Sequence, residues 1–304
     1  MLQEIFYWFF NMSIIAVIAG VIVLLLRRVK KIPRRFVVFL WLIPFLRMTI
    51  PIGIGSPYSL MSLISRFTTK TVVVYQPFGD LSFSMTNSIM VADRYFPITY
   101  KINVLDQVFY IASIIWLIVL GTILLVLTVV YVMTLHEMKD ATHWHDNIYL
   151  SDKILSPAVY GIIKPRIVLP TSYKERELEF ILLHEKMHIR RADNLWRVLA
   201  FVVAAAHWFN PFCWIFLKYF LEDLELSCDE MVLVKLGGDR AKEYAMSLVE
   251  SKESASVFAS PFGGAKIRIR IENILSFKKM TWVSFTAFLT LIITIFCILL
   301  TNAG

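Results

Sequence analysis

Two histidines and a glutamate lie close together in the order His184-Glu185-x-x-His188. On a helix the two histidines face the same side, about 5–6 Å apart at their Cβ atoms, so both can bind one metal ion. Glu185 directly follows the first histidine in the sequence. From there its carboxylate can hold a water molecule that is bound to the ion. This is the pattern of zinc peptidases, in which two neutral imidazoles are ligands and a carboxylate is the general base.

The neighbouring residues predict that this motif lies on a helix. Residues 177–181 lead into it without Gly or Pro, and apolar residues recur around it at helical spacing. A catalytic zinc ion takes three protein ligands and keeps its fourth position open for water. The chain must therefore supply one more ligand from elsewhere.

Residues 224–230 offer that ligand and again have helical character. Glu225 is the preferred ligand, and Asp229, one turn later, can accept the free ring N–H of a ligand histidine. Glu222 is the competing ligand. Cys228 is a weaker candidate, because a cysteine on such a helix is more often a small buried residue. We expect a Zn²⁺ ion and no organic cofactor.

The composition is that of a membrane protein. Hydrophobic residues make up 58% of the 304 residues and the mean hydropathy is +0.65, whereas soluble domains are about 45–50% apolar. The net charge of +8 comes from basic residues at the ends of apolar segments, as topology signals do, so we expect no direct binding of nucleic acid. The three cysteines show no disulfide pattern.

Four apolar segments predict four transmembrane spans, because about 20 residues cross the hydrocarbon core; they are residues 5–26, 36–54, 109–135 and 282–300. The second is irregular because it contains Pro44, Arg47 and Pro51. Six basic residues in 27–35 place that loop in the cytoplasm. The N-terminus is then outside, and residues 56–106 form an external loop.

The zinc motifs fall between the third and fourth spans, on the cytoplasmic side. We therefore divide the chain into 1–135 with three spans, 136–280 as the cytoplasmic zinc metallopeptidase domain, and 281–304 with the fourth span. Within the domain, residues 156–170 predict a β-hairpin. Its edge strand either holds the substrate backbone by strand addition or is purely structural. His143 and His145 are interpreted as surface residues rather than ligands.

Residues 195–221 are apolar enough to span the membrane, but the zinc site excludes this. A crossing would separate His184 from Glu225 by about 30 Å, whereas zinc–ligand bonds are about 2 Å long. The segment must turn back, and Asn210-Pro211 is the expected helix break. We predict a re-entrant or membrane-associated helical hairpin, with His207 as an interfacial or core histidine.

The order of these features resembles the BlaR/MecR antirepressor family of integral-membrane zinc metallopeptidases. The shared features are three spans, an S-P-x-x-x-G-x-x-x-P-x-I-x-L-P hairpin, H-E-x-x-H, an Asn-Pro hairpin, E-x-x-x-D and a fourth span. The resemblance implies a zincin-like (gluzincin) α+β domain in a mainly helical, polytopic protein of the bacterial cytoplasmic membrane. It also implies zinc ligands His184, His188 and Glu225, with Glu185 as base and Asp229 bonded to a ligand.

The resemblance further implies a partner, a cytoplasmic DNA-binding repressor whose cleavage derepresses β-lactam resistance genes. A homodimer is compatible with it. Self-cleavage would fall near Ser260-Pro261-Phe262, although a proline beside the scissile bond makes a poor substrate. Typical members continue into an external penicillin-binding domain with an S-x-x-K nucleophile. Because this chain stops at Gly304, we expect no β-lactam acylation of it, and residues 276–279 match S-x-x-K by chance.

Two other functions compete with this one. The chain could be a membrane zinc peptidase of another stress or quality-control pathway, or a non-catalytic transducer with a structural zinc site. Glu185 argues against the transducer, because a structural site needs no base beside an open position.

Overall fold

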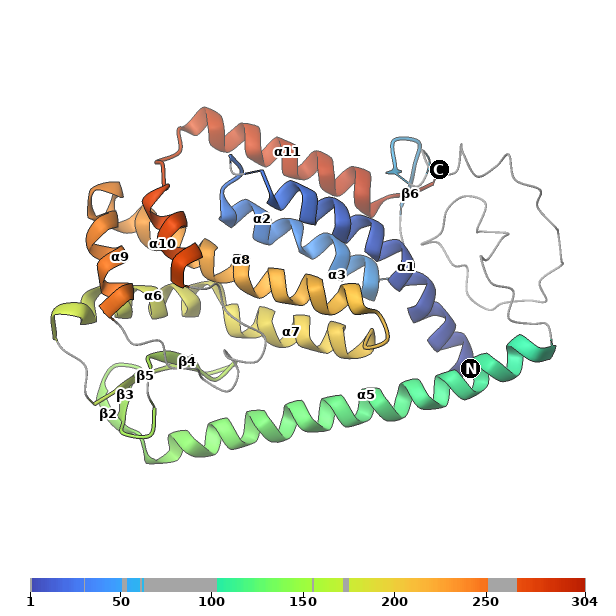
Figure 1. Ribbon diagram of the computed structural model, residues 1–304, viewed down its shortest axis with the longest axis horizontal. Coiled ribbons are helices and arrows are strands. Elements are labelled where there is room, and N and C mark those ends of the chain that lie inside the picture. The colour runs from blue at the N-terminus through green and yellow to red at the C-terminus, as the bar shows by residue number, and fades with distance from the viewer. Residues whose placement is uncertain are drawn as a thin grey trace.

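The computed structural model describes residues 2–29, 31–50, 54–60, 62, 103–154, 156–171, 175–250 and 267–303. The predicted self-cleavage residues Ser260, Pro261 and Phe262, and most of the expected external loop, lie outside the described residues. Most of the described chain is helical, and one four-stranded sheet lies at the end opposite the two termini (Figure 1).

Among the described residues, three helices are long and apolar enough to cross a membrane. They are α1 (Leu2–Arg27), the segment Gln107–Asp140, most of which is α5 (Asn103–Glu137), and α11 (Trp282–Leu300). They coincide with the first, third and fourth predicted spans. The second predicted span consists of two short helices, so four spans remain a prediction.

The two short helices are α2 (Arg34–Leu40) and α3 (Leu42–Thr49), which meet at Trp41. Pro44 explains the break, because it lacks the N–H that would bond Leu40 in a continuous helix and its ring crowds that carbonyl. In α3 the proline lies in the first turn, where an N–H has no helical partner. The structure therefore confirms that the second apolar segment is irregular.

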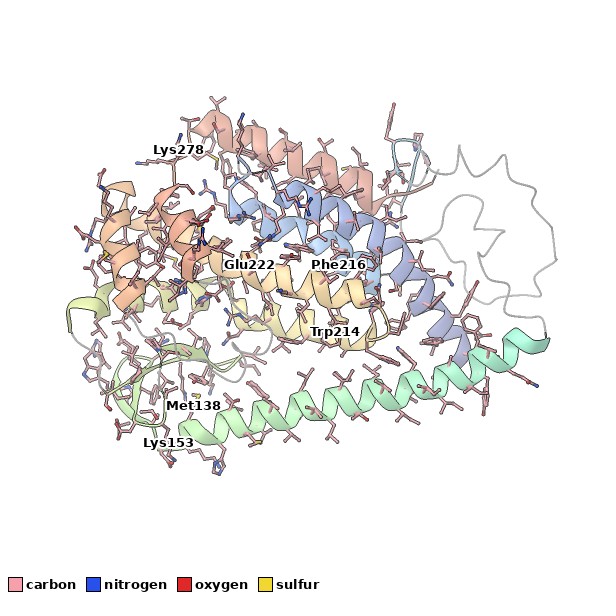
Figure 2. The ribbon with its side chains drawn as sticks, in the orientation of Figure 1. Met138, Lys153, Trp214, Phe216, Glu222 and Lys278 are labelled. Atoms are coloured by element: carbon pink, nitrogen blue, oxygen red, sulfur yellow. The ribbon has the colours of Figure 1, made fainter. Side chains whose placement is uncertain are left out.

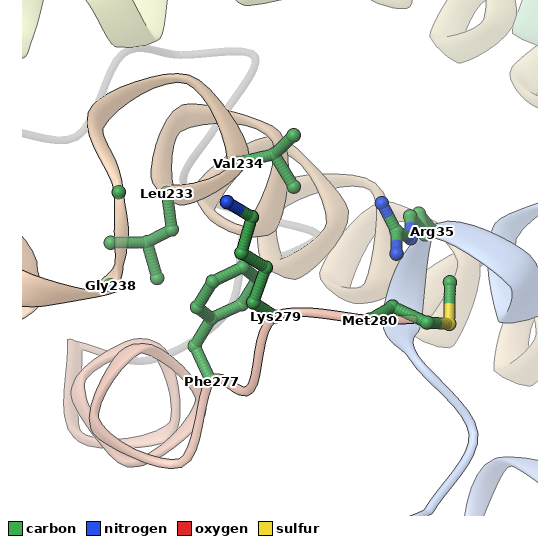
Figure 3. Close-up of a pocket in the computed structure, with 8 residues that line it drawn as sticks. Arg35, Leu233, Val234, Gly238, Phe277, Lys279 and Met280 are labelled. Atoms are coloured by element: carbon green, nitrogen blue, oxygen red, sulfur yellow. The ribbon is translucent and has the colours of Figure 1, made fainter. Parts of the chain in front are cut away.

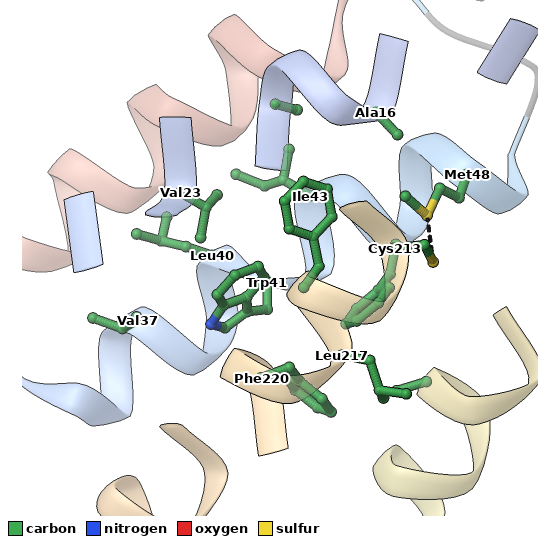
Figure 4. Close-up of a cluster of buried hydrophobic side chains, with 14 of the residues drawn as sticks. Ala16, Val23, Val37, Leu40, Trp41, Ile43, Met48, Cys213, Leu217 and Phe220 are labelled. Atoms are coloured by element: carbon green, nitrogen blue, oxygen red, sulfur yellow. Dashed lines mark hydrogen bonds between the residues drawn. The ribbon is translucent and has the colours of Figure 1, made fainter. Parts of the chain in front are cut away.

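The main core lies where α1, α2 and α3 pack against α8 (Pro211–Leu236). Figure 4 shows apolar side chains from all four helices meeting there, among them Val23, Val37, Ile43 and Leu217. Helix α11 covers the other side of α2 and α3 (Figure 1). The helix that carries Glu225 is thus packed directly against the N-terminal apolar helices.

The expected turn at Asn210-Pro211 is present. Helix α7 (Asp193–Ala206) ends before it and α8 begins at Pro211, so 195–221 forms a helical hairpin. The Asn210 side chain accepts a hydrogen bond from the Phe212 N–H at 3.0 Å, and Pro211 occupies the first helical position, which favours proline. His207 is fully buried beside Phe9 and Phe209, as expected of a core histidine.

The sheet has the order β2-β3-β5-β4, from strands β2 (Thr142–His145), β3 (Ile148–Ser151), β4 (Ala158–Tyr160) and β5 (Arg166–Pro170). Strands β4 and β5 are antiparallel, which confirms the predicted hairpin, and β4 is an edge strand. His143 and His145 lie exposed on β2. Apolar residues of β3 and β5 pack against Ile181 of α6 (Glu175–Arg191).

Helices α9 (Ala241–Glu250) and α10 (Ile267–Leu275) pack on α8 at the same end of the molecule. The remaining short elements are β1 (Gly55–Ser56), η2 (Met138–Asp140), η3 (Gly238–Arg240) and β6 (Asn302–Ala303). A cavity of about 130 Å³ between Arg35, the end of α8 and Lys279 is lined by none of the predicted site residues (Figure 3).

Candidate metal centre

Helix α6 brings His184 and His188 together on one buried face. Their Nε2 atoms lie 3.1 Å apart, their rings are perpendicular, and each residue is 7% exposed. The spacing of four residues accounts for this, because it places both side chains on one side of the helix.

Glu225 approaches both histidines from α8. Its Oε2 atom lies 3.7 Å from His184 Nε2 and 3.7 Å from His188 Nε2, while its Oε1 accepts a hydrogen bond from Arg197 of α7. Nitrogen and oxygen ligands of a tetrahedral zinc ion, with bonds of about 2.0–2.1 Å, are about 3.3 Å apart. Two nitrogens and one oxygen therefore converge at nearly the separation that zinc requires.

Cys228 also belongs to this cluster, since its Sγ lies within 4.8 Å of the ligand nitrogens of both histidines. That sulfur donates to the backbone carbonyl of His184 at 3.6 Å, as a small buried residue between α6 and α8 would. Glu222, labelled in Figure 2, forms an ion pair with Arg27 at 2.7 Å on the side of α8 that faces α1. The structure thus brings Glu225 and Cys228, but not Glu222, to the histidines.

The other ring nitrogen of His188 is held by Asp193, whose Oδ2 lies 2.6 Å from Nδ1. Asp193 is 1% exposed and follows Ala192, which ends α6 in the left-handed conformation with φ of 53°. Our sequence reasoning missed Asp193. The sequence does show a carboxylate five residues after the second histidine. The place of this carboxylate in space depends on the left-handed turn at Ala192, which the sequence does not predict.

The other ring nitrogen of His184 faces Asp229 and Tyr244. The Tyr244 hydroxyl lies 2.9 Å from His184 Nδ1 and donates to Asp229 Oδ1 at 2.6 Å, and this carboxylate oxygen is 3.3 Å from the same Nδ1. Asp229 is thus placed beside a candidate ligand histidine, whereas Tyr244 was not anticipated. Such partners fix the tautomer and orientation of a ligand ring.

Arg270 of α10 closes the network by pairing with Asp229 through two hydrogen bonds of 2.8 and 2.9 Å. Burial raises the pKa of Asp229, but the Arg270 guanidinium outweighs it and holds that pKa well below its usual range. Burial likewise raises the pKa of Glu225, and His188 and Arg197 outweigh it. Both carboxylates are therefore ionised near neutral pH.

This donor set fits a zinc ion. With Nδ1–H groups directed to Asp193 and to Tyr244 and Asp229, the Nε2 atoms of both histidines are acceptors that converge. His184 Nε2 also lies 3.3 Å from Nη2 of Arg270. Two acceptor nitrogens and a carboxylate oxygen at such short separations favour a shared cation. Glu185 directly follows His184 on α6, is 8% exposed and forms no hydrogen bond or ion pair with the residues that the structure describes. Its carboxylate is free to bind water.

The fold and the site together define a helical protein with apolar, membrane-length helices and a buried centre that can bind a metal. Comparison with known families then places the chain more narrowly. The family described as BlaR1 peptidase M56 matches residues 7–274. The chain therefore belongs to this metallopeptidase family, as the resemblance predicted.

Individual relatives agree with this assignment. The chain is 29% identical over 155 residues to the regulatory protein BlaR1 of Bacillus licheniformis, covering 47% of this chain and 26% of that protein. It is 34% identical over 110 residues to the methicillin resistance mecR1 protein of Staphylococcus aureus, covering 35% of this chain and 19% of that protein. The matches thus span about a quarter or less of the length of these relatives.

Proposed function

We propose that this chain is an integral-membrane zinc metalloendopeptidase that transduces an antibiotic or cell-envelope signal. It does so by cleaving a cytoplasmic transcriptional repressor and thereby derepressing β-lactam resistance genes. One observation carries the proposal: the side chains of His184, His188 and Glu225 converge in a chain of the BlaR1 peptidase family.

The residues have distinct tasks in peptide-bond hydrolysis. His184, His188 and Glu225 would hold the zinc ion, while Asp193 and the pair Asp229–Tyr244 fix the two imidazole rings. When bound, zinc polarises the substrate carbonyl and lowers the pKa of water toward about 7. Glu185 takes the proton of the attacking water and passes it to the leaving amine.

The edge strand β4 is the proposed place for the substrate backbone, by strand addition. Asn194, next to Asp193, donates to the carbonyl oxygens of Val159 at 2.9 Å and Gly161 at 3.1 Å. The residues that orient His188 and that hold β4 are therefore neighbours in the chain. This places the proposed binding strand at a set position beside the metal centre.

The proposed substrate follows from the family. The relatives are a regulatory protein and a methicillin resistance protein, and the resemblance implies a cytoplasmic DNA-binding repressor as their target. In this proposal the protein lies in the bacterial cytoplasmic membrane with its N-terminus outside and its peptidase domain in the cytoplasm. The six basic residues of 27–35 support this orientation.

The test is co-expression of the chain with the repressor encoded beside it, followed by immunoblotting of the repressor with and without a β-lactam. We expect the wild type to cleave the repressor and Glu185→Ala to leave it intact with zinc still bound. Lys186→Ala, an exposed neighbour on the same helix, is the matched control and should cleave normally.

Each outcome separates the candidate functions. Cleavage that is lost only in Glu185→Ala supports the proposal, and drug dependence assigns it to the β-lactam response. An intact repressor with the wild-type chain, which still binds zinc, would point to another stress or quality-control substrate or to a non-catalytic transducer.

A further inference from the structure

Arg270 reaches the metal centre from an element that carries none of the predicted site residues. It lies on α10, and its side chain is 11% exposed. Its Nε donates to Asp229 Oδ2 at 2.9 Å and its Nη2 to Asp229 Oδ1 at 2.8 Å. A paired, planar guanidinium of this kind is held in one orientation.

The same Nη2 atom also faces the metal-binding side of the site. It lies 3.3 Å from His184 Nε2, the nitrogen that converges with His188 and Glu225. A guanidinium has five N–H groups, and the carboxylate of Asp229 uses two. The second N–H of Nη2 therefore faces His184 Nε2, on the side where the metal would bind and next to the place that a substrate carbonyl would take.

Pairing with Asp229 explains two of the N–H groups of Arg270, but it does not explain why the Nη2 group also lies beside His184 Nε2. A permanent positive charge close to a metal ligand opposes the binding of a metal cation, and the low dielectric of a buried site strengthens that repulsion. The charge is favourable there if a negative charge forms nearby during the reaction. Peptide hydrolysis forms such a charge on the carbonyl oxygen.

We propose that Arg270 is a catalytic residue that donates a hydrogen bond to the carbonyl oxygen of the scissile peptide bond. The inference rests on the proposed peptidase function. When the water oxygen bonds to the carbonyl carbon, the π electron pair moves onto the carbonyl oxygen and Glu185 takes the water proton. When the C–N bond breaks, the pair returns to form the carbonyl again and the proton on Glu185 goes to the leaving nitrogen. The remaining water proton passes from the new carboxylic acid to the amine, so the products are a carboxylate and an ammonium group. Arg270 stabilises the oxyanion between these steps.

The experiment uses the full-length, zinc-loaded chain in detergent and N-phosphoryl-leucyl-tryptophan, whose tetrahedral phosphoryl group imitates the oxyanion. Binding is measured by calorimetry for the wild type, Arg270→Gln and Arg268→Gln. Arg268 is the matched control, because it lies on the same helix, is 89% exposed and pairs with Glu272. Zinc content and thermal unfolding are measured for each protein.

We expect Arg270→Gln to keep its zinc and to bind the phosphoryl peptide about 10- to 100-fold more weakly, the usual effect of a hydrogen bond to a charged group. Arg268→Gln should bind it like the wild type. If the repressor is cleaved, Arg270→Gln should lower kcat about 100-fold with little change in KM, as for other oxyanion donors. Equal affinity of both variants for the phosphoryl peptide would overturn the proposal.

If Arg270→Gln does not fold or loses zinc, the same binding experiment is done with Arg270→Lys. Lysine keeps the charge beside Asp229 but lacks the planar fork that serves the carboxylate and the substrate oxygen together. Arg270→Lys should bind the phosphoryl peptide about 10-fold more weakly than the wild type does. If the variant is folded and zinc-loaded and binds the peptide as tightly as the wild type, the proposal is overturned. The binding assay needs no turnover, so it separates an error about Arg270 from an error about the peptidase function.

Discussion

At the scale of single residues, the identity of the third ligand is the most open feature of the centre. Glu225 and Cys228 both reach the histidines from α8. The carboxylate oxygen is equidistant from the two Nε2 atoms, whereas the thiol contacts the backbone carbonyl of His184 as well as the two imidazoles. We therefore propose Glu225 as the third ligand.

This assignment predicts different zinc contents in two variants. Glu225→Gln should retain far less than one zinc per chain after dialysis, because a neutral amide oxygen replaces an anionic ligand. Cys228→Ser should retain about one, as the wild type does for a single site. Mass spectrometry of the purified proteins measures both, and the reverse pattern would show that the thiol is the ligand.

Asp193 should control the affinity for zinc without touching it. Asp193→Asn keeps the side-chain shape but removes the charge that holds the Nδ1–H of His188, so zinc affinity should fall about 10- to 100-fold. Competition with a fluorescent zinc chelator measures this. Asp239→Asn, an exposed aspartate beyond α8, should leave the affinity unchanged, and a wild-type affinity in Asp193→Asn would remove Asp193 from the site.

At the scale of elements, α8 joins the metal centre to the N-terminal helices. One side carries Glu225 and Asp229, and another carries Asp223, which is fully buried. Asp223 accepts hydrogen bonds from Arg27 at 2.8 Å, Arg34 at 3.2 Å and the Trp41 indole at 2.9 Å. This single carboxylate thus fixes α8 against α1 and α2.

Replacing Asp223 should therefore loosen α8. Asp223→Asn leaves two arginines without their shared counter-charge, and we expect a loss of about 2–3 kcal/mol, less than for a fully buried pair because the arginines are partly exposed. Thermal unfolding in detergent measures it. Glu222→Gln removes only one contact, to Arg27, and should cost less than about 1 kcal/mol; equal effects would contradict a special role for Asp223.

Helices α1 and α8 approach closely at Gly20. A Cβ atom there would lie 2.1 Å from the ring of Phe216, which is itself fully buried and packed against Trp41. Gly20→Ala should therefore destabilise the protein by about 1–3 kcal/mol, as overpacking of a core does.

Gly121 of α5 provides the matched control for Gly20, because an added Cβ would meet nothing within 4 Å. Gly121→Ala should leave the thermal unfolding temperature unchanged or raise it slightly, since alanine is the better helix former. Similar destabilisation by both substitutions would show that the α1–α8 contact is not the cause.

At the scale of the whole molecule, α1, the pair α2 and α3, and α5 run in alternate directions between two ends (Figure 1). The two termini and the start of α5 lie at one end, and the sheet, α9 and α10 lie at the other. We propose that the chain crosses the membrane four times, with α2 and α3 together forming the second crossing. In this proposal the end with the termini is external and the end with the sheet is cytoplasmic.

Cysteine labelling tests this topology. In a background with Cys297→Ser, which removes the exposed native thiol, Tyr58→Cys should react with an impermeant maleimide in intact cells. Lys278→Cys should react only after lysis, because it lies at the start of α11 near the peptidase domain (Figure 2). Both positions are exposed, and the opposite labelling pattern would invert the topology.

Several features of this protein were determined by the sequence alone, because each depends on neighbouring residues. The spacing of His184 and His188 places them on one face of a helix wherever that helix lies. The apolar segments at 5–26, 109–135 and 282–300 form long helices because their composition suits no other environment. Asn210-Pro211 caps and starts a helix through local bonds.

Only the tertiary structure decided which residues that are distant in the sequence meet at the site. Tyr244 and Arg270 meet His184 across 60 and 86 residues of chain, and Glu222 is drawn away from the site by Arg27. Asp193 reaches His188 only because Ala192 turns the backbone left-handed. These contacts depend on how separate helices pack, which is set by the shapes and charges of side chains distant in sequence.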